Sequence, residues 1–238
     1  MKIFKTIAIA LFASIFIYSC VGISVGAFMH DTEVSELNTE TTMKNFSGIS
    51  VAGSMNVVLN QGNKTSVLVK GSDKDALDKV VIYVNDGNLY IKTKKKFLGF
   101  VGSINLEDIT IYVTTPKIES IELAGSGNIT TDKPINADNV NVELAGSGDI
   151  DILNAFTCNL LDVQIAGSGN ATFEKVIANS LKTSIAGSGN VSYNNIDVVS
   201  AASDIAGSGN ITLKGKASKH TQDIVGSGNV GTTELKTP

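Results

Sequence analysis

A pentapeptide that recurs six times constrains the fold of this chain more than any other feature of the sequence. The sequence Ala-Gly-Ser-Gly-Asn, with small variations, returns at intervals of 21, 21, 20, 20 and 19 residues and contains 12 of the 23 glycines. The copies begin at Ala124, Ala145, Ala166, Ala186, Ala206 and Val225. A repeat of this length at a nearly constant period is typical of a solenoid, in which each unit stacks on its neighbours.

The residues around the pentapeptide distinguish the repeat from a flexible Gly-Ser linker, which has no apolar pattern. In every copy an aliphatic residue lies two positions before the first glycine, and another lies four positions after it. The two sets are Leu123, Leu144, Ile165, Ile185, Ile205 and Ile224, and Ile129, Ile150, Ala171, Val191, Ile211 and Val230. The intervening positions are polar, and this alternation with period two predicts strand, tight turn, strand in each copy.

Stacking the copies in register would bury aliphatic columns that no single strand pair could bury alone. Glycine supplies the positive φ angles and the close backbone approach that such turns need. The residue after the second glycine is Asn in five copies and Asp149 in the other, and stacked Asn side chains can hydrogen-bond from coil to coil. We therefore expect an all-β fold, a right-handed parallel β-helix with about 20 residues per coil and Gly-Ser-Gly turns.

Residues 45–120 predict a β-rich part that precedes the repeats. Residues 52–56 (AGSMN) form a degenerate copy of the pentapeptide. Residues 81–94 alternate around Asn85-Asp86-Gly87-Asn88, which predicts a β-hairpin with a positive-φ turn. The expected organisation is this hairpin-containing part over 45–120, followed by the repeat solenoid over 121–238.

The amino terminus predicts export from the cytoplasm. Lys2 and Lys5 precede an uncharged apolar run over residues 6–29, which is the pattern of a signal peptide. The sequence Ile-Tyr-Ser-Cys at 17–20 resembles a bacterial lipobox. In that interpretation residues 1–19 are removed and Cys20 is the lipid attachment site.

Two alternatives to the lipoprotein stay open from the sequence. Ordinary signal peptidase would cut after Ala27, and retention of the whole run would leave a membrane anchor, since about 20 apolar residues span a bilayer. Residues 20–44 are polar and acidic beyond His30 and predict a tether. Each alternative places the remaining chain outside the cytoplasmic membrane, and the lipobox favours an outer-membrane or periplasmic lipoprotein of a bacterial envelope.

The composition argues against several classes of function. All 19 basic residues are Lys and the net charge is −4, so the chain lacks the basic surface and Arg forks that nucleic acids require. The two cysteines, Cys20 and Cys158, form neither a disulfide framework nor a zinc motif. We expect no nucleic-acid partner, no metal and no cofactor, and we interpret Cys158 as a small buried hydrophobic residue.

An enzyme acting on polysaccharides is the main alternative to a binding module, because other parallel β-helices cleave acidic polymers. Such chemistry needs clustered carboxylates or a cationic group that faces uronates. The nearest candidate is an acidic column of Glu122, Glu143, Asp204 and Asp223. Glu122 and Glu143 would lie about one strand spacing apart and could hold a weak cation or face solvent. No catalytic residue is assigned, and a structural or signalling partner of other envelope proteins is a further alternative.

Several motifs taken together resemble one known family. They are Phe46-Ser47-Gly48-Ile49, the segments VVLNQG at 57–62 and GNLYI at 87–91, and the Gly-Ser-Gly-Asn-Ile repeats. Over about residues 46–230 the chain is similar to the auto-transporter adhesin, head GIN domain family of bacterial envelope proteins. The resemblance implies a β-helical solenoid with a role in adhesion. Only nine residues follow Asn229, so we expect no translocator barrel in this chain.

These observations favour a non-enzymatic envelope protein that presents a rigid solenoid on a tether. The membrane would be contacted through the N-terminal lipid or apolar anchor, and the ligand would be a surface glycan or a protein. The sequence assigns neither the ligand-binding residues nor the oligomeric state.

Overall fold

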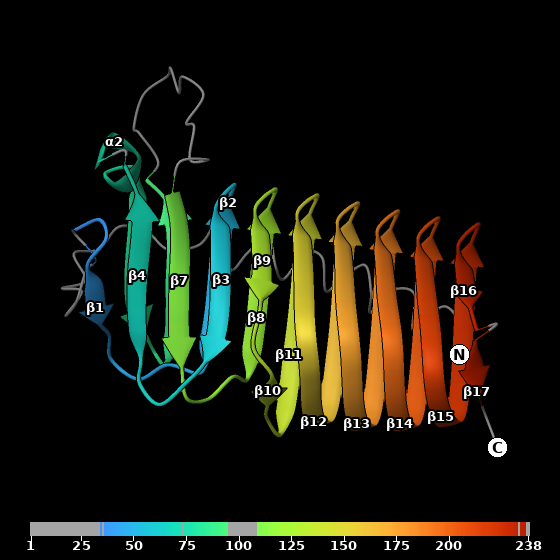
Figure 1. Cartoon of the computed structure of the whole chain (residues 1–238). Coiled ribbons are helices and arrows are strands. Elements are labelled where there is room, and N and C mark those ends of the chain that lie inside the picture. The colour runs from blue at the N-terminus through green and yellow to red at the C-terminus, as the bar shows by residue number, and fades with distance from the viewer. Residues whose placement is uncertain (1–33, 35, 73, 95–108, 233, 237–238) are drawn as a thin grey trace.

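The computed structural model shows a rod of stacked β-coils with a broader head at one end, coloured blue to green in Figure 1. It describes residues 34, 36–72, 74–94, 109–232 and 234–236, so the expected signal peptide and Cys20 lie outside the described residues. Within the described part, no helix combines the length and apolar character that a membrane span requires. The predicted all-β parallel solenoid is confirmed.

The elements are β1 (Glu40–Thr42), β2 (Gly48–Gly53), β3 (Asn56–Gln61), β4 (Ser66–Gly71), α2 (Lys74–Leu77), β5 (Val80–Asn85), β6 (Asn88–Thr93), β7 (Ile109–Thr115), β8 (Ser120–Gly125), β9 (Asn128–Thr131), β10 (Ile135–Asn136), β11 (Asn139–Gly146), β12 (Asp149–Gly167), β13 (Asn170–Gly187), β14 (Asn190–Gly207), β15 (Asn210–Gly226), β16 (Asn229–Gly231) and β17 (Leu235–Lys236). The strands β1 to β17 form one sheet that wraps around the core.

Each regular coil turns at three places, and β13 shows how. Inward and outward residues alternate along this strand except where two consecutive residues face outward, between Phe173 and Val176 and again between Ala178 and Leu181. The Gly-Ser-Gly turn supplies the remaining corner. The sequence pattern predicted this last corner alone, because two outward residues in a row break the period of two.

Parallel pairing in register builds a continuous core. Ile165 pairs with Ile185 and Ile185 with Ile205, and all three are buried. Phe173 stacks on Tyr193 with ring centroids 5.1 Å apart. Burying one such side chain stabilises the fold by about 1.5 to 3 kcal/mol, so a column repeated from coil to coil offsets the entropy lost on ordering the chain.

The degenerate copy at 52–56 forms the first corner of the stack. β2 pairs in parallel with β8 and places Gly53 opposite Gly125. Met55 stands where the later copies have their second glycine, and its side chain is fully buried.

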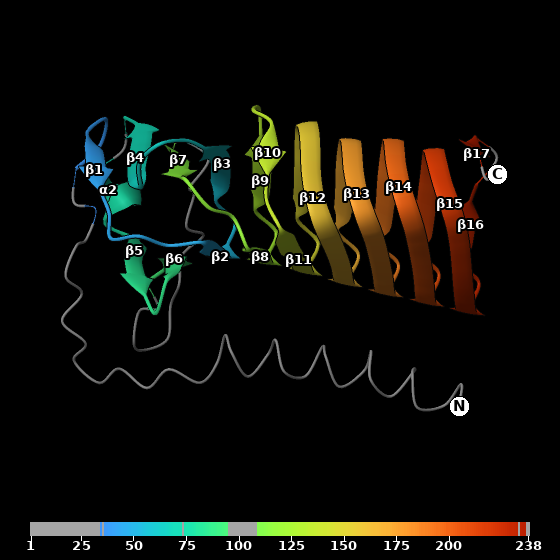
Figure 2. The ribbon, with the colours of Figure 1, turned by 90° about the horizontal axis from the view of Figure 1, so that it is seen from below.

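The insertion between β3 and β8 builds the head. β6 pairs with β2 and β7 pairs with β3, so the two rows of strands continue past the first corner (Figure 2). β5 and β6 form the predicted hairpin, and its turn has positive φ at Asp86 (48°) and Gly87 (73°), the pattern of a type I′ turn. The end of the segment predicted as a tether, residues 20–44, is instead part of the head. Its strand β1 pairs antiparallel with β4, and Glu40 accepts a hydrogen bond from Lys64 at 2.5 Å.

The coils differ in length at one corner. The number of outward residues at this corner falls along the rod. The coil that begins at Asp149 has three (residues 153–155), the coil that begins at Asn190 has two (194–195), and the coil that begins at Asn210 has one (Lys214). The Gly-Ser-Gly corners stay in register throughout, so the surface of the rod varies where the chain is shortened.

Candidate functional site

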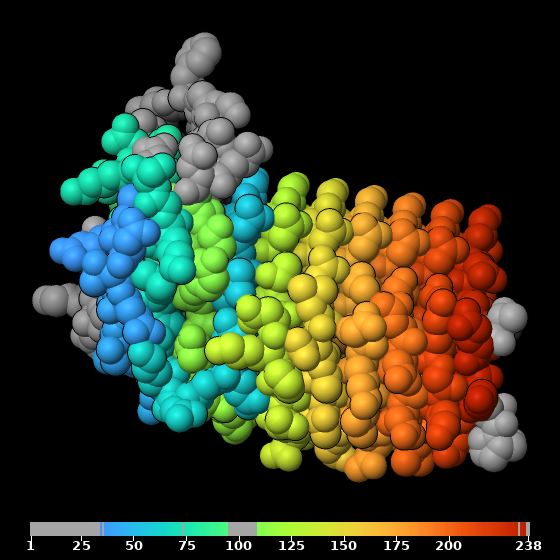
Figure 3. Space-filling view, in the orientation of Figure 1, coloured from blue at the N-terminus to red at the C-terminus, as the bar shows by residue number. Residues whose placement is uncertain are grey.

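The Gly-Ser-Gly corners form one edge of the rod and appear as a row of projections in Figure 3. At each corner the backbone contacts the preceding coil. The Gly146 carbonyl accepts hydrogen bonds from the N–H groups of Ser168 (2.8 Å) and Gly169 (3.0 Å). A Cβ at Gly167, where φ is +128°, would lie 2.4 Å from that same carbonyl oxygen. The turn N–H groups are therefore engaged in stacking, so these Gly-x-Gly turns are no cradle for a phosphate.

The predicted Asn ladder runs beside these corners. Asn190 donates to Asn170 at 2.9 Å, and Asn210 donates to Asn190 at 2.8 Å. Asp149 can only accept, and it accepts from Asn170 at 2.9 Å. These side chains hold neighbouring coils together.

A second Asn ladder follows another corner of the coils. Asn179 donates to Asn159 at 2.8 Å, and Asn159 donates to Asn139 at 3.3 Å. This ladder was not predicted, although its signal, Asn at intervals of 20 residues, is present in the sequence.

The acidic column lies on one flat side of the rod. Glu122 and Glu143 are register partners, as are Asp204 and Asp223 farther along. Burial raises the pKa of the half-buried Glu122, and the charge of Glu143 raises it further. Burial also raises the pKa of Glu143, opposed by its hydrogen bond from Asn141. Among the described residues no three His, Cys, Asp or Glu side chains are grouped so as to hold a metal ion.

Cys158 lies half-buried against the core, as a free thiol. Burial raises its pKa to about 11. The thiolate is the nucleophilic form of cysteine, so this side chain is a poor nucleophile at neutral pH and fits the structural role that the sequence suggested.

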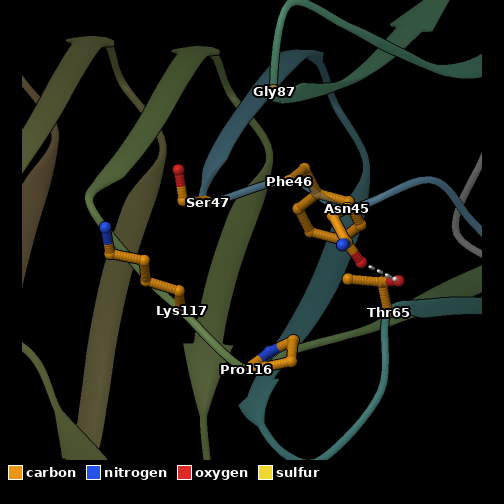
Figure 4. A pocket seen from close by; sticks show the side chains of 7 residues that line it. All are labelled: Asn45, Phe46, Ser47, Thr65, Gly87, Pro116 and Lys117. Carbon is orange, nitrogen blue, oxygen red and sulfur yellow. Dashed lines mark hydrogen bonds between the residues drawn. The ribbon is translucent and has the colours of Figure 1, made fainter.

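A cavity of about 340 Å³ opens at the junction of head and rod (Figure 4). Its lining includes Asn45, Phe46, Ser47, Thr65, Pro116 and Lys117. This volume lies in the range of small-molecule sites. We call this space the Phe46 cavity.

Several polar groups around the Phe46 cavity already have partners. Thr65 donates to the Met43 carbonyl at 2.9 Å, and Lys117 forms an ion pair with Glu119 at 2.5 Å. The Phe46 ring and Pro116 are left as the apolar part of the lining, which suits the apolar part of a ligand.

A second hollow of about 410 Å³ lies near the C-terminal end, on the side of the rod that follows the shortened corner. We call it the lysine hollow, after Lys175, Lys216 and Lys236, which line it together with Asp197, Glu234 and Gly215. No motif in the sequence marks these residues as a site, and the hollow brings together four successive parts of the chain.

Replacing Glu143 with Gln should stabilise the protein at neutral pH. Burial raises the pKa of this carboxyl in the folded state, so stability is greatest below the unfolded pKa and falls as the pH rises through the folded pKa. Gln keeps the size of the side chain and removes the charge. Urea unfolding measured from about pH 3.5 to 7, across the usual carboxyl range, should show a flatter pH dependence for Glu143→Gln.

Glu119→Gln is the matched control, because the Glu119 carboxyl should change stability with pH in the opposite direction. Lys117 and Ser47 lower the pKa of Glu119 by hydrogen bonding, so its contribution to stability is present above the unfolded pKa and is lost as the pH falls. An unchanged pH dependence in Glu143→Gln would contradict the assigned burial.

Solved structures share this fold. A putative adhesin from Bacteroides fragilis NCTC 9343 has a TM-score of 0.67 at 22% identity and covers 88% of this chain and 99% of its own. A putative lipid binding protein from Parabacteroides distasonis ATCC 8503 has a TM-score of 0.65 at 20% identity, over 84% of this chain and 95% of its own. A putative adhesin from the same strain has a TM-score of 0.67 at 17% identity, with the same coverage.

Among curated proteins none matches the sequence. The family described as "Putative auto-transporter adhesin, head GIN domain" matches residues 45–173 and 156–238, which together span most of the chain and include both the head and every repeat. The motifs that suggested this family are the ones that build the first corner, the hairpin and the stacked corners. The chain therefore belongs to the head GIN domain family of putative auto-transporter adhesins.

Proposed function

We propose that this protein is a non-enzymatic binding module of the bacterial cell envelope that attaches to a surface ligand in the manner of an adhesin. One observation supports this most: the glycines and amides that could have formed a chemical site are used to stack the coils. The outward surface includes the Phe46 cavity and the lysine hollow. Membership of a putative adhesin family agrees with this function and with a location in the envelope or outside the cell.

The residues that could support the alternative, hydrolysis or elimination on a polysaccharide, have unsuitable surroundings. An acid/base pair needs groups whose environments separate their pKa values. Burial raises the pKa of Glu122 and Glu143 in the acidic column, and also that of Asp162, the register partner of Asn141 in the neighbouring column. Like shifts on one flat side favour a structural role for this column over a catalytic one.

The Phe46 cavity supports a second candidate, the binding of an amphiphilic ligand. Its apolar lining would contact an acyl or other apolar chain, and Asn45, Ser47 and Lys117 at its wall would lie near a polar head. The similar fold of a putative lipid binding protein agrees with this candidate.

Binding and turnover should be measured together on immobilised glycans and matrix proteins. We expect the mature protein to bind at least one class of surface ligand saturably, without releasing reducing ends or unsaturated products from any glycan. Turnover that disappears in Glu143→Gln would contradict the non-enzymatic assignment. Absence of saturable binding to every ligand would contradict the adhesin function and favour a structural or signalling role.

We also propose that Cys20 anchors the mature protein as a lipoprotein, supported by the lipobox at 17–20. In bacterial cells, Cys20→Ser should abolish fatty-acid labelling and leave the precursor uncleaved, because lipid transfer precedes cleavage at such sites. Normal processing of Cys20→Ser would contradict the anchor and favour cleavage after Ala27. A variant changed at Ala27 alone should be labelled like the parent.

A further inference from the structure

The lysine hollow results from the way the last coil is shortened. Only Lys214 lies at the corner where earlier coils have two or three residues, and the next position is Gly215. Gly215 has φ +117°, and a Cβ there would lie 2.3 Å from the Ile196 carbonyl oxygen. The backbone geometry therefore requires glycine, and Gly215 is itself part of the lining of the hollow.

The charges around the hollow are unbalanced. Lys216 and Lys236 are register partners on β15 and β17, so their Cα atoms lie about one strand spacing apart. Like charges directly opposite one another destabilise a sheet. Lys175 adds a third ammonium group from β13.

Carboxylates in the hollow neutralise only part of this charge. Glu234 forms an ion pair with Lys214 at 3.0 Å. Asp197 is the register partner of Lys216 on its other side. Within 4.0 Å of Lys175, Lys216 or Lys236, however, there is no carboxylate oxygen of any described residue. Three lysines against one unpaired carboxylate leave a positive site in a chain whose net charge is −4.

We propose that the lysine hollow binds uronate units of an acidic polysaccharide. This rests on the proposed binding function and names the class of ligand. A carboxylate would neutralise the opposed pair Lys216 and Lys236 through charge-assisted hydrogen bonds. Lysine acts as a compact point charge on a flexible stem, and this suits carboxylates presented at varied angles by a polymer.

The other lining residues suit a sugar ring. Asn195 offers an amide for hydroxyl groups, and Ile177, which is 38% exposed, offers an apolar contact for the C–H face of a pyranose. A volume of about 410 Å³ is large enough for a small-molecule ligand.

Calorimetric titration of the mature protein with polygalacturonate tests this site. We expect the triple variant Lys175→Ala, Lys216→Ala, Lys236→Ala to bind at least about tenfold more weakly, which is the loss of about 1.4 kcal/mol of binding free energy. Binding by the parent should also weaken as NaCl rises from about 0.1 to 1 M, since the screening length falls from about 10 to 3 Å.

The matched control is Lys74→Ala, Lys133→Ala, Lys219→Ala, which removes the same charge from exposed positions outside the hollow. It should bind like the parent, and neither triple variant should melt below the parent. An equal loss in the control would overturn the site in favour of diffuse charge attraction. Lysine-dependent binding to phosphatidylglycerol vesicles without binding to polygalacturonate would overturn the uronate assignment in favour of a phosphate ligand.

These outcomes separate the inference from the proposed function. If polygalacturonate does not bind while another surface ligand does, the uronate site is wrong and the adhesin function stands. If no surface ligand binds, the adhesin function itself is wrong.

Discussion

The close contact of backbones at the Gly-Ser-Gly corner is the constraint on which the rest of this structure depends. At these corners a glycine carbonyl accepts two N–H groups of the next coil, and a Cβ at either glycine from Gly125 onward would approach a carbonyl oxygen to between 2.2 and 2.5 Å. The contact fixes the register of each coil. A slip by one residue would turn the inward aliphatic columns outward, so the corner holds the whole core in place.

This constraint also determines where function can lie. Residues that resemble a chemical motif, the Gly-x-Gly turns and the Asn columns, are engaged in stacking. The chain departs from the regular coil in the insertion that builds the head and at the corner where coils change length. The Phe46 cavity lies at the first of these places and the lysine hollow at the second. The stacked repeats thus separate the Phe46 cavity, beside the head, from the lysine hollow near the C-terminal end.

Much of this fold could be predicted because its signals are local. The period-two alternation located the inward columns, and the turn residues at 85–88 located the hairpin. The degenerate copy at 52–56 proved to be a true corner, with Gly53 opposite Gly125. The corners at 174–175 and 179–180 were missed because consecutive outward residues interrupt the alternation.

The candidate sites were beyond sequence reasoning for a different reason. The Phe46 cavity joins residues near 46, 65, 87 and 116, and the lysine hollow joins residues near 175, 197, 216 and 236. No period links the residues of the Phe46 cavity, and the pairing of β6 and β7 with β2 and β3 depends on long-range contacts. The residues of the lysine hollow do follow the coil period, but the hollow itself depends on where the shortened corner places them. The acidic column, by contrast, was located correctly as a stack, and its burial became visible only with the coils in place.

Hydrogen exchange at the corner amides tests the stacked-corner account most directly. The N–H groups of Ser168, Gly169 and Gly189 each donate to a carbonyl of the preceding coil, at 2.8, 3.0 and 3.1 Å. If these contacts hold the coils in register, the three amides should exchange only through global unfolding, as slowly as the amides of the buried core. Exchange at the rate of an unstructured Gly-Ser peptide, with Ile165 and Ala171 still protected, would contradict the account and show that the corners are flexible linkers between strands.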